Sequence, residues 1–306
     1  MNFRHLKIFI TVCEEKNMTR AAKRLFISQP SVSQAIAELE EYYQVKLFER
    51  LSRKIYITKA GKDLLSYAYH IVALNQEMEE VIRKNGRQRT IVLGATVTIG
   101  TYVLPSLLAG LRGEDNELDI NTVVKNTKFI EESILNSQID LGLVEGEISS
   151  ADLEVKPFCE DELVLICHKD HPLAEEEVVT IPDLQGQSFF VREEGSGSRA
   201  LFLNAMKKRG VSVKLQGVFN NTEAIKIASM YNLGLGVVSK ISISLHDQDL
   251  VVLNVKELSL KRNFSLVYHK DKYISQELAW LMEYIQTNGG GSTRLKLPFD
   301  WMRGEV

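Results

Sequence analysis

The chain has 306 residues, enough for about two or three domains. Hydrophobic residues make up 44% of it and charged residues 25%, which excludes a disordered chain, a collagen-like fibre and a coiled-coil rod. The net charge is −3 but unevenly spread: residues 1–62 hold 12 Lys/Arg and 6 Asp/Glu (+6), and the remainder hold 25 and 34 (−9). This asymmetry predicts a basic binding module on an acidic body.

Three helices are predicted at the start of the chain. Apolar residues recur at helical spacing over residues 3–13 and again over 19–25. A third helix follows Ser28, a favourable N-cap, and its inner stripe is Val32, Ile36 and Leu39. Its first turn presents side chains suited to base edges and phosphates, together with a proline that costs no hydrogen bond there: Gln29, Pro30, Ser31, Ser33 and Gln34. The pattern predicts a helix-turn-helix; a solvated surface helix is the alternative.

The next segment favours DNA binding. Arg50, Arg53 and Lys54 cluster at a predicted hairpin whose second strand contains residues 55–57. A basic hairpin of this kind can lie along a phosphate backbone. We therefore predict a winged helix-turn-helix over residues 1–58.

These motifs resemble a known family. The run S-Q-P-S-V-S-Q-A-I-A-E-L-E (28–40), followed by L-F-E-R-x-x-R-x-x-x-I-T-x-A-G (47–61), is similar to the winged helix-turn-helix of LysR-type transcriptional regulators. The resemblance implies that the polar residues of the third helix lie in the major groove of promoter DNA. It also implies that Arg50 and Arg53 engage the backbone beside the wing.

Gln44 departs from the family pattern, which usually has Gly just past this helix. If the position is left-handed, Gln costs on the order of 1 kcal/mol relative to Gly.

A long helix is predicted from Lys59 to about Lys84, ended by Asn85-Gly86-Arg87-Gln88. A heptad frame gives these a and d positions: Leu64, Ala68, Ile71, Asn75, Met78 and Ile82. The family resemblance implies that residues 59–88 form a dimerising linker. The helix within it, from residue 59 to about 84, would be roughly 40 Å long at about 1.5 Å per residue. We hypothesise that Asn75 fixes helix register, with a solvent-facing Asn as the alternative.

Strand and helix patterns alternate over 89–288, which predicts an α/β fold with a mostly parallel sheet. Strands are expected near residues 90–96, 119–126, 139–146, 161–169, 188–195 and 233–240, and helices near 104–111, 127–137 and 275–286. The resemblance implies a two-subdomain effector-binding domain like a periplasmic binding protein, with a ligand cleft between the subdomains. Subdomain I would comprise about 89–161 and 267–288, and subdomain II about 162–266. The chain would cross near Glu160–Glu162 and Phe264–Val267.

Polar residues at the strand ends are the candidate ligand contacts, because ligands sit beyond the carboxyl ends of strands in such sheets. The candidates are Thr96, Thr98, Asn126, Thr127 and Glu145 from subdomain I, and Ser196, Ser198, Arg199 and Thr222 from subdomain II. Thr98 is expected to precede a helix, and residues 195–199 offer free backbone donors, an arrangement that can hold an anion. Ordinary helix caps and turns are the alternative, and Arg199 could instead pair with Glu193 or Glu194.

The ligand is predicted to be a small anionic metabolite. The stretch R-E-E-G-S-G-S-R (192–199) resembles members that sense metabolites of sulfur, nitrogen or carbon assimilation. The resemblance further implies a homodimer to homotetramer, with RNA polymerase as a possible partner. We expect no cofactor and no metal ion.

Two other functions are alternatives. An enzyme is disfavoured because His168 and His171 stand without a Ser/His/Asp order, metal spacing or nucleotide-binding glycine fingerprint. A solute-binding protein without a regulatory role is the remaining alternative.

Other features bear on compartment and ends. Cys13, Cys159 and Cys167 are too scattered for a disulfide framework or a zinc site, although the last two could form a redox pair. The N-terminus lacks a signal peptide pattern, and the uncharged stretch 90–111 is interpreted as a strand and helix rather than a membrane span. We therefore expect a cytoplasmic protein. The tail 289–306 is linker-like and either a natural extension or an added segment.

Overall fold

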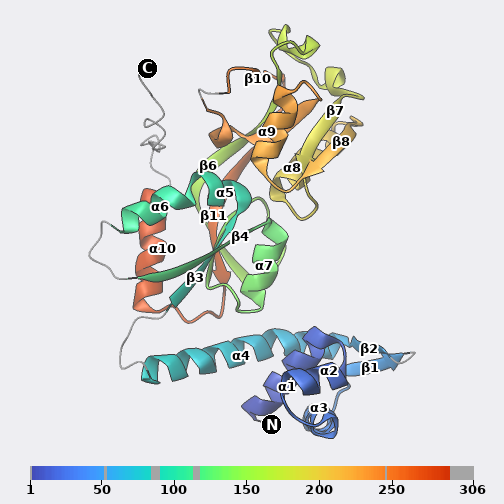
Figure 1. Ribbon diagram of the computed structural model, residues 1–306, viewed down its shortest axis with the longest axis vertical. Coiled ribbons are helices and arrows are strands. Elements are labelled where there is room, and N and C mark those ends of the chain that lie inside the picture. Colours follow the sequence, from blue (N-terminus) through green and yellow to red (C-terminus); the bar gives the residue numbers. More distant parts are fainter. Residues whose placement is uncertain (1, 52–53, 84–89, 113–117, 245–246, 290–306) are drawn as a thin grey trace. The chain divides into compact units, whose positions relative to one another are not determined.

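The computed structural model describes residues 2–51, 54–83, 90–112, 118–244 and 247–289. These form two compact units, one up to Arg89 and one from Thr90 onward (Figure 1). Arg53, the expected helix end at residues 85–88 and the tail from residue 290 lie outside the described residues.

The first unit is the predicted winged helix-turn-helix with its long helix. Its elements are α1 (Phe3–Glu15), α2 (Met18–Arg24), α3 (Gln29–Tyr43), β1 (Phe48–Leu51), β2 (Lys54–Ile57) and α4 (Lys59–Arg83). Each of the first three helices begins at a side chain that accepts backbone N–H groups: Asn2, Asn17 and Ser28. These caps satisfy donors that the first helical turn leaves without partners. The helix boundaries therefore follow from local sequence signals.

One hydrophobic core joins the helices of the first unit. Phe9 and Leu39 are fully buried, as is Ala21, whose small side chain permits close helix crossing. The rings of Phe9 and Phe48 lie 5.4 Å apart and connect α1 to the wing. The predicted inner face of α3 is confirmed, since Val32 and Ile36 are also buried.

The predicted heptad stripe of α4 is buried in its first part and exposed in its second part. Leu64 and Ala68 pack on the core of the first unit. Further along, Ile71, Met78 and Ile82 are 38%, 52% and 68% exposed. The second part of the helix thus presents an apolar stripe that its own unit does not cover.

The second unit is a nine-stranded sheet with helices on its faces, in the order β4-β3-β5-β11-β6-β9-β7-β8, with β10 paired to β6. The strands are β3 (Thr90–Thr96), β4 (Asp119–Lys125), β5 (Leu141–Glu145), β6 (Leu153–His168), β7 (Ser188–Arg192), β8 (Lys214–Phe219), β9 (Leu235–Ser239), β10 (Leu250–Val252) and β11 (Lys261–His269). The α-helices are α5 (Val97–Tyr102), α6 (Leu104–Leu111), α7 (Thr127–Leu135), α8 (Gly197–Lys208), α9 (Thr222–Met230) and α10 (Gln276–Asn288). None of the described helices is long and apolar enough to span a bilayer.

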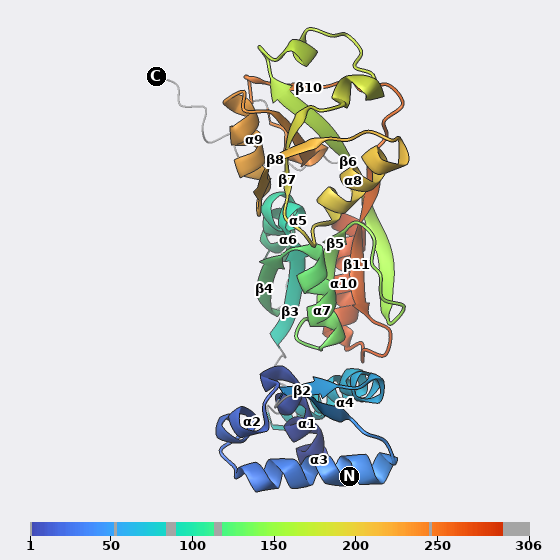
Figure 2. The same cartoon turned by 90° about the vertical axis from the view of Figure 1, so that its right-hand side faces the viewer.

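The sheet is mixed, which corrects the expectation of a mostly parallel one. Strands β4, β3 and β5 are parallel to one another, as are β8, β7 and β9. Between these triplets run β6 and β11, antiparallel to each other and to their neighbours. We call the part built on β3–β5 half I and the part built on β7–β9 half II; β6 and β11 run through both (Figures 1 and 2). The predicted crossings fall on these two strands.

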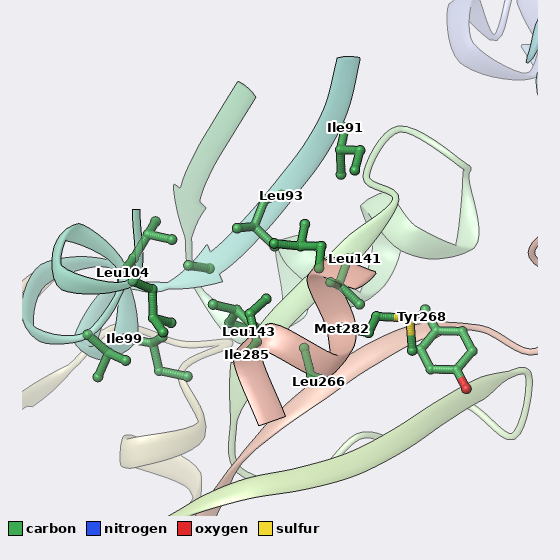
Figure 3. Packing of buried hydrophobic residues seen from close by; sticks show 14 of the residues in the cluster. Ile91, Leu93, Ile99, Leu104, Leu141, Leu143, Leu266, Tyr268, Met282 and Ile285 are labelled. Atoms are coloured by element: carbon green, nitrogen blue, oxygen red, sulfur yellow. The ribbon is translucent and has the colours of Figure 1, made fainter. Parts of the chain in front are cut away.

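Each half has its own core. In half I, residues of β3, β5 and β11 pack with α5, α6 and α10 (Figure 3). On the opposite face, α7 approaches the strands at Gly94 and Gly142, where an added Cβ would lie 3.1 Å from Ile130 and 2.8 Å from Ile134, respectively. A separate core in half II includes Phe189 and Phe202, whose rings are 4.9 Å apart.

Candidate functional site

The N-terminal turn of α3 exposes the residues predicted to read DNA. Gln29, Pro30 and Gln34 are exposed, whereas Ser31 and Ser33 are half-buried. The amide of Gln29 donates to Ser33 Oγ at 2.8 Å, and the amide of Gln34 donates to Glu38 Oε1 at 2.9 Å. Both amides lie on a solvent-facing helix surface, where such bonds exchange readily for bonds to other polar groups.

Ser33 also has a structural role, because its hydroxyl contacts Met18 Sδ of α2 at 3.3 Å. This contact helps to set α3 against α2. The two serines of the predicted reading face are therefore less accessible than the two glutamines.

The wing is positioned by Glu40, which sequence reasoning missed. Its Oε1 accepts the N–H groups of Leu47 (2.9 Å) and Phe48 (3.2 Å), and its Oε2 lies 2.7 Å from Lys46 Nζ. Burial acts to raise the pKa of Glu40, but these bonds outweigh burial and hold the pKa below its ordinary value. The carboxylate thus ties α3 to the first strand of the wing.

Two of the three basic residues predicted for the wing, Arg50 and Lys54, lie in its antiparallel strands β1 and β2. Arg50 lies opposite Ile55, and Lys54 lies opposite Leu51 in the antiparallel register. The side chains of Arg50 and Lys54, like Arg53, lie outside what the structure describes.

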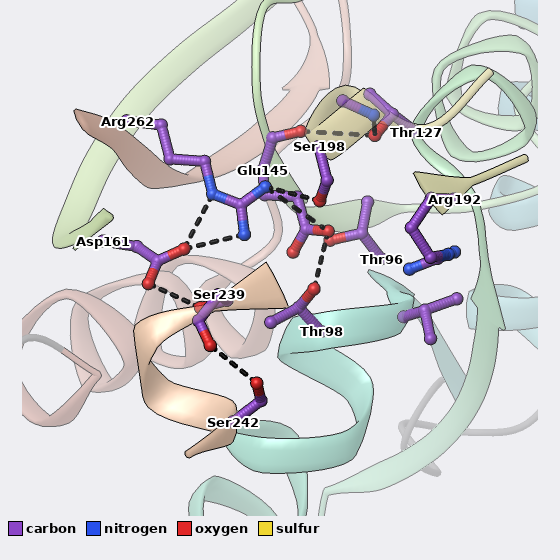
Figure 4. Close-up of polar contacts among 12 residues, drawn as sticks. Thr96, Thr98, Thr127, Glu145, Asp161, Arg192, Ser198, Ser239, Ser242 and Arg262 are labelled. Atoms are coloured by element: carbon purple, nitrogen blue, oxygen red, sulfur yellow. Dashed lines mark hydrogen bonds and ion pairs between the residues drawn. The ribbon is translucent and has the colours of Figure 1, made fainter. Parts of the chain in front are cut away.

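Most predicted ligand residues meet where the two halves of the second unit join. The following side chains are at most 6% exposed: Thr96, Thr98, Thr127, Glu145, Ser196, Ser198 and Thr222. Asn126 and Arg199 are half-buried. We call the seven buried residues except Thr222, together with Asp161, Arg192, Ser239 and Arg262, the junction cluster; Figure 4 labels all of them but Ser196. Buried polar groups at this density need partners, so their hydrogen bonds can be followed one by one.

Arg262 of β11 is the hub of the cluster. Its Nε donates to Asp161 Oδ2 at 2.7 Å, and Nη2 lies 2.7 Å from the same oxygen. Its Nη1 donates to Ser198 Oγ at 2.8 Å and lies 3.8 Å from Glu145 Oε1 (Figure 4). Ser239 donates to Asp161 Oδ1 at 2.6 Å. One guanidinium therefore links both crossing strands to α8 and to the end of β5.

Thr98 lies within α5 rather than before a helix, which corrects the prediction. The N-cap is Thr96, and the Thr98 hydroxyl donates to Glu145 Oε1 at 2.8 Å. Because this hydroxyl is occupied by a carboxylate, it is not a free donor for an anion.

The glycines of the 195–198 run allow the halves to touch. A Cβ on Gly197 would lie 2.5 Å from the carbonyl oxygen of Glu145. The Gly197 N–H donates to Thr127 Oγ1 at 3.2 Å, and that hydroxyl donates to the Glu145 carbonyl at 3.2 Å. Asn126 reaches across as well, with Nδ2 3.4 Å from the Glu194 carbonyl. The prediction of free backbone donors is thus wrong for Gly197.

Arg199 pairs with neither expected glutamate. Its Nη1 donates to the Arg192 carbonyl at 3.3 Å, and it is Arg192 that pairs with Glu193, through Nε (2.8 Å) and Nη2 (3.0 Å). Burial acts to raise the pKa of Glu193, but the Arg192 bonds outweigh it and the pKa lies below its ordinary value.

Three buried polar atoms of the cluster have no hydrogen-bond partner among the described residues: Arg192 Nη1, Glu145 Oε2 and Arg262 Nη2, the last of which lies 2.7 Å from Asp161 Oδ2 as an ion pair. These three side chains are 2–3% exposed. A buried group without a partner costs about 1–3 kcal/mol, and more when charged. These atoms mark the places where the cluster lacks hydrogen-bond partners.

A second contact between the halves lies outside the predicted set. The Tyr102 hydroxyl of α5 donates to Glu223 of α9. Burial raises the pKa of Tyr102, with the Glu223 bond contributing, so the hydroxyl stays protonated as a donor. Thr222 lies beside this contact at the start of α9, whose N-cap is Asn221.

Sequence models of known families match both units. The model described as LysR substrate binding domain matches residues 84–290, and that of the bacterial regulatory helix-turn-helix protein, lysR family, matches residues 3–62. The chain belongs to the LysR family. It is a LysR-type transcriptional regulator, which confirms the fold class and the family predicted from the motifs.

Individual relatives agree with this assignment. The HTH-type transcriptional regulator CysL of Bacillus subtilis is 34% identical over 267 residues, which is 86% of this chain and 89% of that one. The Synechocystis PCC6803 CcmR regulatory domain, solved in complex with 2-PG, is 27% identical with a TM-score of 0.61, covering 65% of this chain and 96% of that one. Full-length CbnR in complex with its target DNA has a TM-score of 0.60 at 22% identity, covering 94% and 99%, and shows the shared fold.

His168 and His171 have local structural roles in this LysR family member. His171 caps a short 3₁₀ helix by accepting the Leu173 N–H at 3.2 Å, and His168 accepts the Asp170 N–H at 3.1 Å. Burial raises the pKa of Cys167 to about 11, which leaves its thiol protonated and weakly nucleophilic near neutral pH.

Proposed function

We propose that this LysR-type regulator binds promoter DNA through α3 and the wing, and that a small anionic effector bound at the junction cluster modulates that binding. The observation that carries the effector proposal is the unpaired Arg192 Nη1, a charged donor buried between two halves of the domain. Glu193 already compensates the charge of Arg192, but this third nitrogen still lacks an acceptor, and an anionic oxygen is the acceptor that bonds a guanidinium most strongly. The 2-PG complex of the CcmR domain, a relative, supports the same class of ligand.

The proposed DNA contacts are Gln29, Pro30, Ser31, Ser33 and Gln34 of α3, and Arg50, Arg53 and Lys54 of the wing. The exposed amides of Gln29 and Gln34 suit base edges, since an amide can bond adenine through two atoms. The basic wing suits phosphates, which carry affinity without sequence information. The complex of CbnR with its target DNA supports a role of this kind for the shared fold.

The DNA proposal is tested by fluorescence anisotropy with duplexes selected from a random library. Gln34→Ala should weaken binding to selected duplexes by roughly 5- to 150-fold, since one good base contact contributes about 1–3 kcal/mol. Gln248→Ala, an exposed glutamine of the second unit, is the matched control and should leave binding unchanged. Affinity should fall steeply with salt. Equal, salt-insensitive binding of both variants would contradict the proposal.

The effector proposal places the anion at Arg192, with Ser196 next to it in the sequence run that starts α8. Ser196 is buried and makes no cap bond through its side chain, so its hydroxyl can donate to a ligand. The predicted residues Thr96, Thr98, Asn126, Thr127, Glu145, Ser198, Arg199 and Thr222 would frame this site.

Thermal-shift titration with 2-PG, sulfate and phosphate tests the effector site. Arg192→Gln should reduce affinity for any stabilising anion at least about tenfold, because a charged hydrogen bond contributes about 1.5–3 kcal/mol. Arg209→Gln, an exposed arginine just after α8, is the matched control. Ser196→Ala is a milder variant that keeps the Arg192–Glu193 pair intact. Unchanged affinity in both Arg192→Gln and Ser196→Ala would refute the site.

Self-association is proposed to run through α4, as a dimer or tetramer. Tyr67, Ile71, Leu74, Met78 and Ile82 are 38–68% exposed along this helix, more large apolar surface than one helix normally shows to water. RNA polymerase contact is proposed from family membership alone.

The remaining proposals concern organisation. Residues 1–58, 59–88 and 89–288 are proposed as DNA-binding domain, linker and effector domain, with subdomain II at about 162–266. The position of α4 and the ranges of the two matched sequence models support this division. We propose no enzymatic activity, supported by the regulators among its relatives, and a cytoplasmic location, where promoter DNA is reached in bacteria.

A further inference from the structure

Glu145 stands out among the buried groups of the junction cluster. Its side chain is 2% exposed, and its Oε1 accepts one hydrogen bond, from the neutral hydroxyl of Thr98 at 2.8 Å. Its Oε2 accepts none from the described residues. A carboxylate has about four acceptor positions, and a buried one normally fills several of them. Glu145 is therefore short of donors.

Neighbouring cations do not make up the shortfall. Arg262 bonds Asp161 through Nε at 2.7 Å and Ser198 through Nη1 at 2.8 Å. Its Nη2 makes no hydrogen bond but lies 2.7 Å from Asp161, and the guanidinium comes no closer to Glu145 than the 3.8 Å of its Nη1 ion pair. Arg192 is committed to Glu193 through two nitrogens. The cluster and the glutamate bound to it thus hold two guanidinium groups against three carboxylates. A ligand with negative charge alone would add repulsion at Glu145 without supplying a donor.

The unpartnered atoms of Arg192 and Glu145 have opposite polarity. Arg192 Nη1 can donate to an anionic group, and Glu145 Oε2 can accept from a hydroxyl or an ammonium group. In the view of Figure 4, Thr96 is drawn between the two side chains. The cluster therefore offers both a donor atom suited to an anion and an acceptor atom suited to a ligand donor.

We infer that the effector is a small organic anion that also carries a hydrogen-bond donor, a hydroxy acid or an amino acid, and that Glu145 selects for the donor. The inference rests on the proposed effector function of the junction cluster. Inorganic oxyanions and plain carboxylates meet Arg192 but leave Glu145 unsatisfied. A site built to bond a ligand hydroxyl or ammonium rejects the analogue that lacks it, because its own buried acceptor is then left without a partner.

The test uses ligands that differ only in the donor. Isothermal titration of the full chain with succinate, L-malate and L-aspartate compares hydrogen, hydroxyl and ammonium on one carbon; propionate, L-lactate and L-alanine repeat this with one carboxylate. We expect at least one donor-bearing acid to bind at least about tenfold more tightly than its donor-free analogue. Malate against aspartate, and lactate against alanine, then distinguish a hydroxyl from an ammonium donor.

Variants assign the selectivity to Glu145. Glu145→Gln should reduce the ratio of affinities to below about threefold, whereas Glu147→Gln, an exposed neighbour, should keep it. Thr98→Val, which removes the one donor that Glu145 has, should increase the ratio and provides a second reading if Glu145→Gln does not fold. Equal affinities in the wild type, or a ratio unchanged in Glu145→Gln, would overturn the inference.

These failures are distinguishable from failure of the effector site itself. Equal binding of donor-bearing and donor-free acids, lost in Arg192→Gln, would leave the effector proposal standing and refute the role of Glu145. Absence of binding by all six acids and by sulfate, phosphate and 2-PG would overturn both.

Discussion

Replacing Gln44 with Gly should stabilise the DNA-binding unit. Gln44 ends α3 with φ 54° and ψ 35°. This is the left-handed conformation in which the sequence predicts that Gln is less stable than Gly. Its own N–H bonds back to the last turn of the helix, and the following N–H of Val45 bonds to the Glu40 carbonyl at 3.1 Å. The backbone geometry is one that Gly adopts without a steric cost.

The expected change in unfolding free energy combines one stabilising contribution with two that offset it. A side chain in the left-handed region costs about 1–2 kcal/mol. Gly gains conformational freedom in the unfolded chain, which offsets roughly 0.4–1 kcal/mol. The substitution also removes the exposed hydrogen bond from Gln44 Nε2 to the Glu41 carbonyl at 2.6 Å, which contributes at the low end of about 0.5–1.5 kcal/mol. The expected net stabilisation is about 0.5 kcal/mol, or about 2–4 °C in the Tm of a domain of this size.

Differential scanning calorimetry of the full chain, following the transition of the first unit, measures this change. Glu41→Gly is the matched control, because Glu41 lies in the last turn of α3 with helical geometry, where Gly costs about 1 kcal/mol. The two glycines should therefore shift Tm in opposite directions. A fall in Tm for Gln44→Gly as large as that for Glu41→Gly would refute the left-handed assignment.

Three further predictions concern other contacts. Asn75 donates to Glu79 within α4 at 3.0 Å; Asn75→Leu should raise dimer stability and loosen pairing specificity, and an unchanged oligomer distribution in sedimentation would contradict the register hypothesis. Glu40→Gln should destabilise the first unit by about 1–3 kcal/mol in chemical denaturation, because the wing loses a charged acceptor; wild-type stability would argue against the tie. The lowered pKa of Glu193 means that its pairing with Arg192 stabilises the second unit above about pH 4.5 and is lost as pH falls through the lower folded-state pKa. Glu193→Gln should reduce this acid-induced loss, measured as unfolding free energy against pH.

Local signals made much of the fold predictable. Ser28 and Pro30 locate the start of α3, and the strand at residues 90–96 and the helix at 104–111 have the expected bounds. The sequence pattern does not predict the first part of β6, because this part contains Pro157. In the structure Pro157 pairs with Ser265 of β11, directly beside a shift in the pairing register. Proline argues against a strand in sequence patterns but is tolerated at such irregularities.

Only the part of the candidate site that lies near strand ends could be predicted from the sequence. Thr96, Thr98 and the run from Gly195 to Ser198 lie at or within a few residues of strand ends, so their position could be inferred from the alternation of elements. Arg262 and Asp161 are 101 residues apart and meet only because β6 and β11 pair in a particular antiparallel register. No local pattern specifies that register. The roles of Thr98 and Gly197 were mistaken because their bonding partners come from other elements.

Sequencing of the DNA bound by the protein in cells tests the central claim most directly. The account predicts enrichment of a limited set of promoter sites that share one sequence motif, and loss of that enrichment in Gln34→Ala. Uniform recovery of genomic DNA, or enrichment that Gln34→Ala leaves intact, would contradict a regulator that reads promoters through α3.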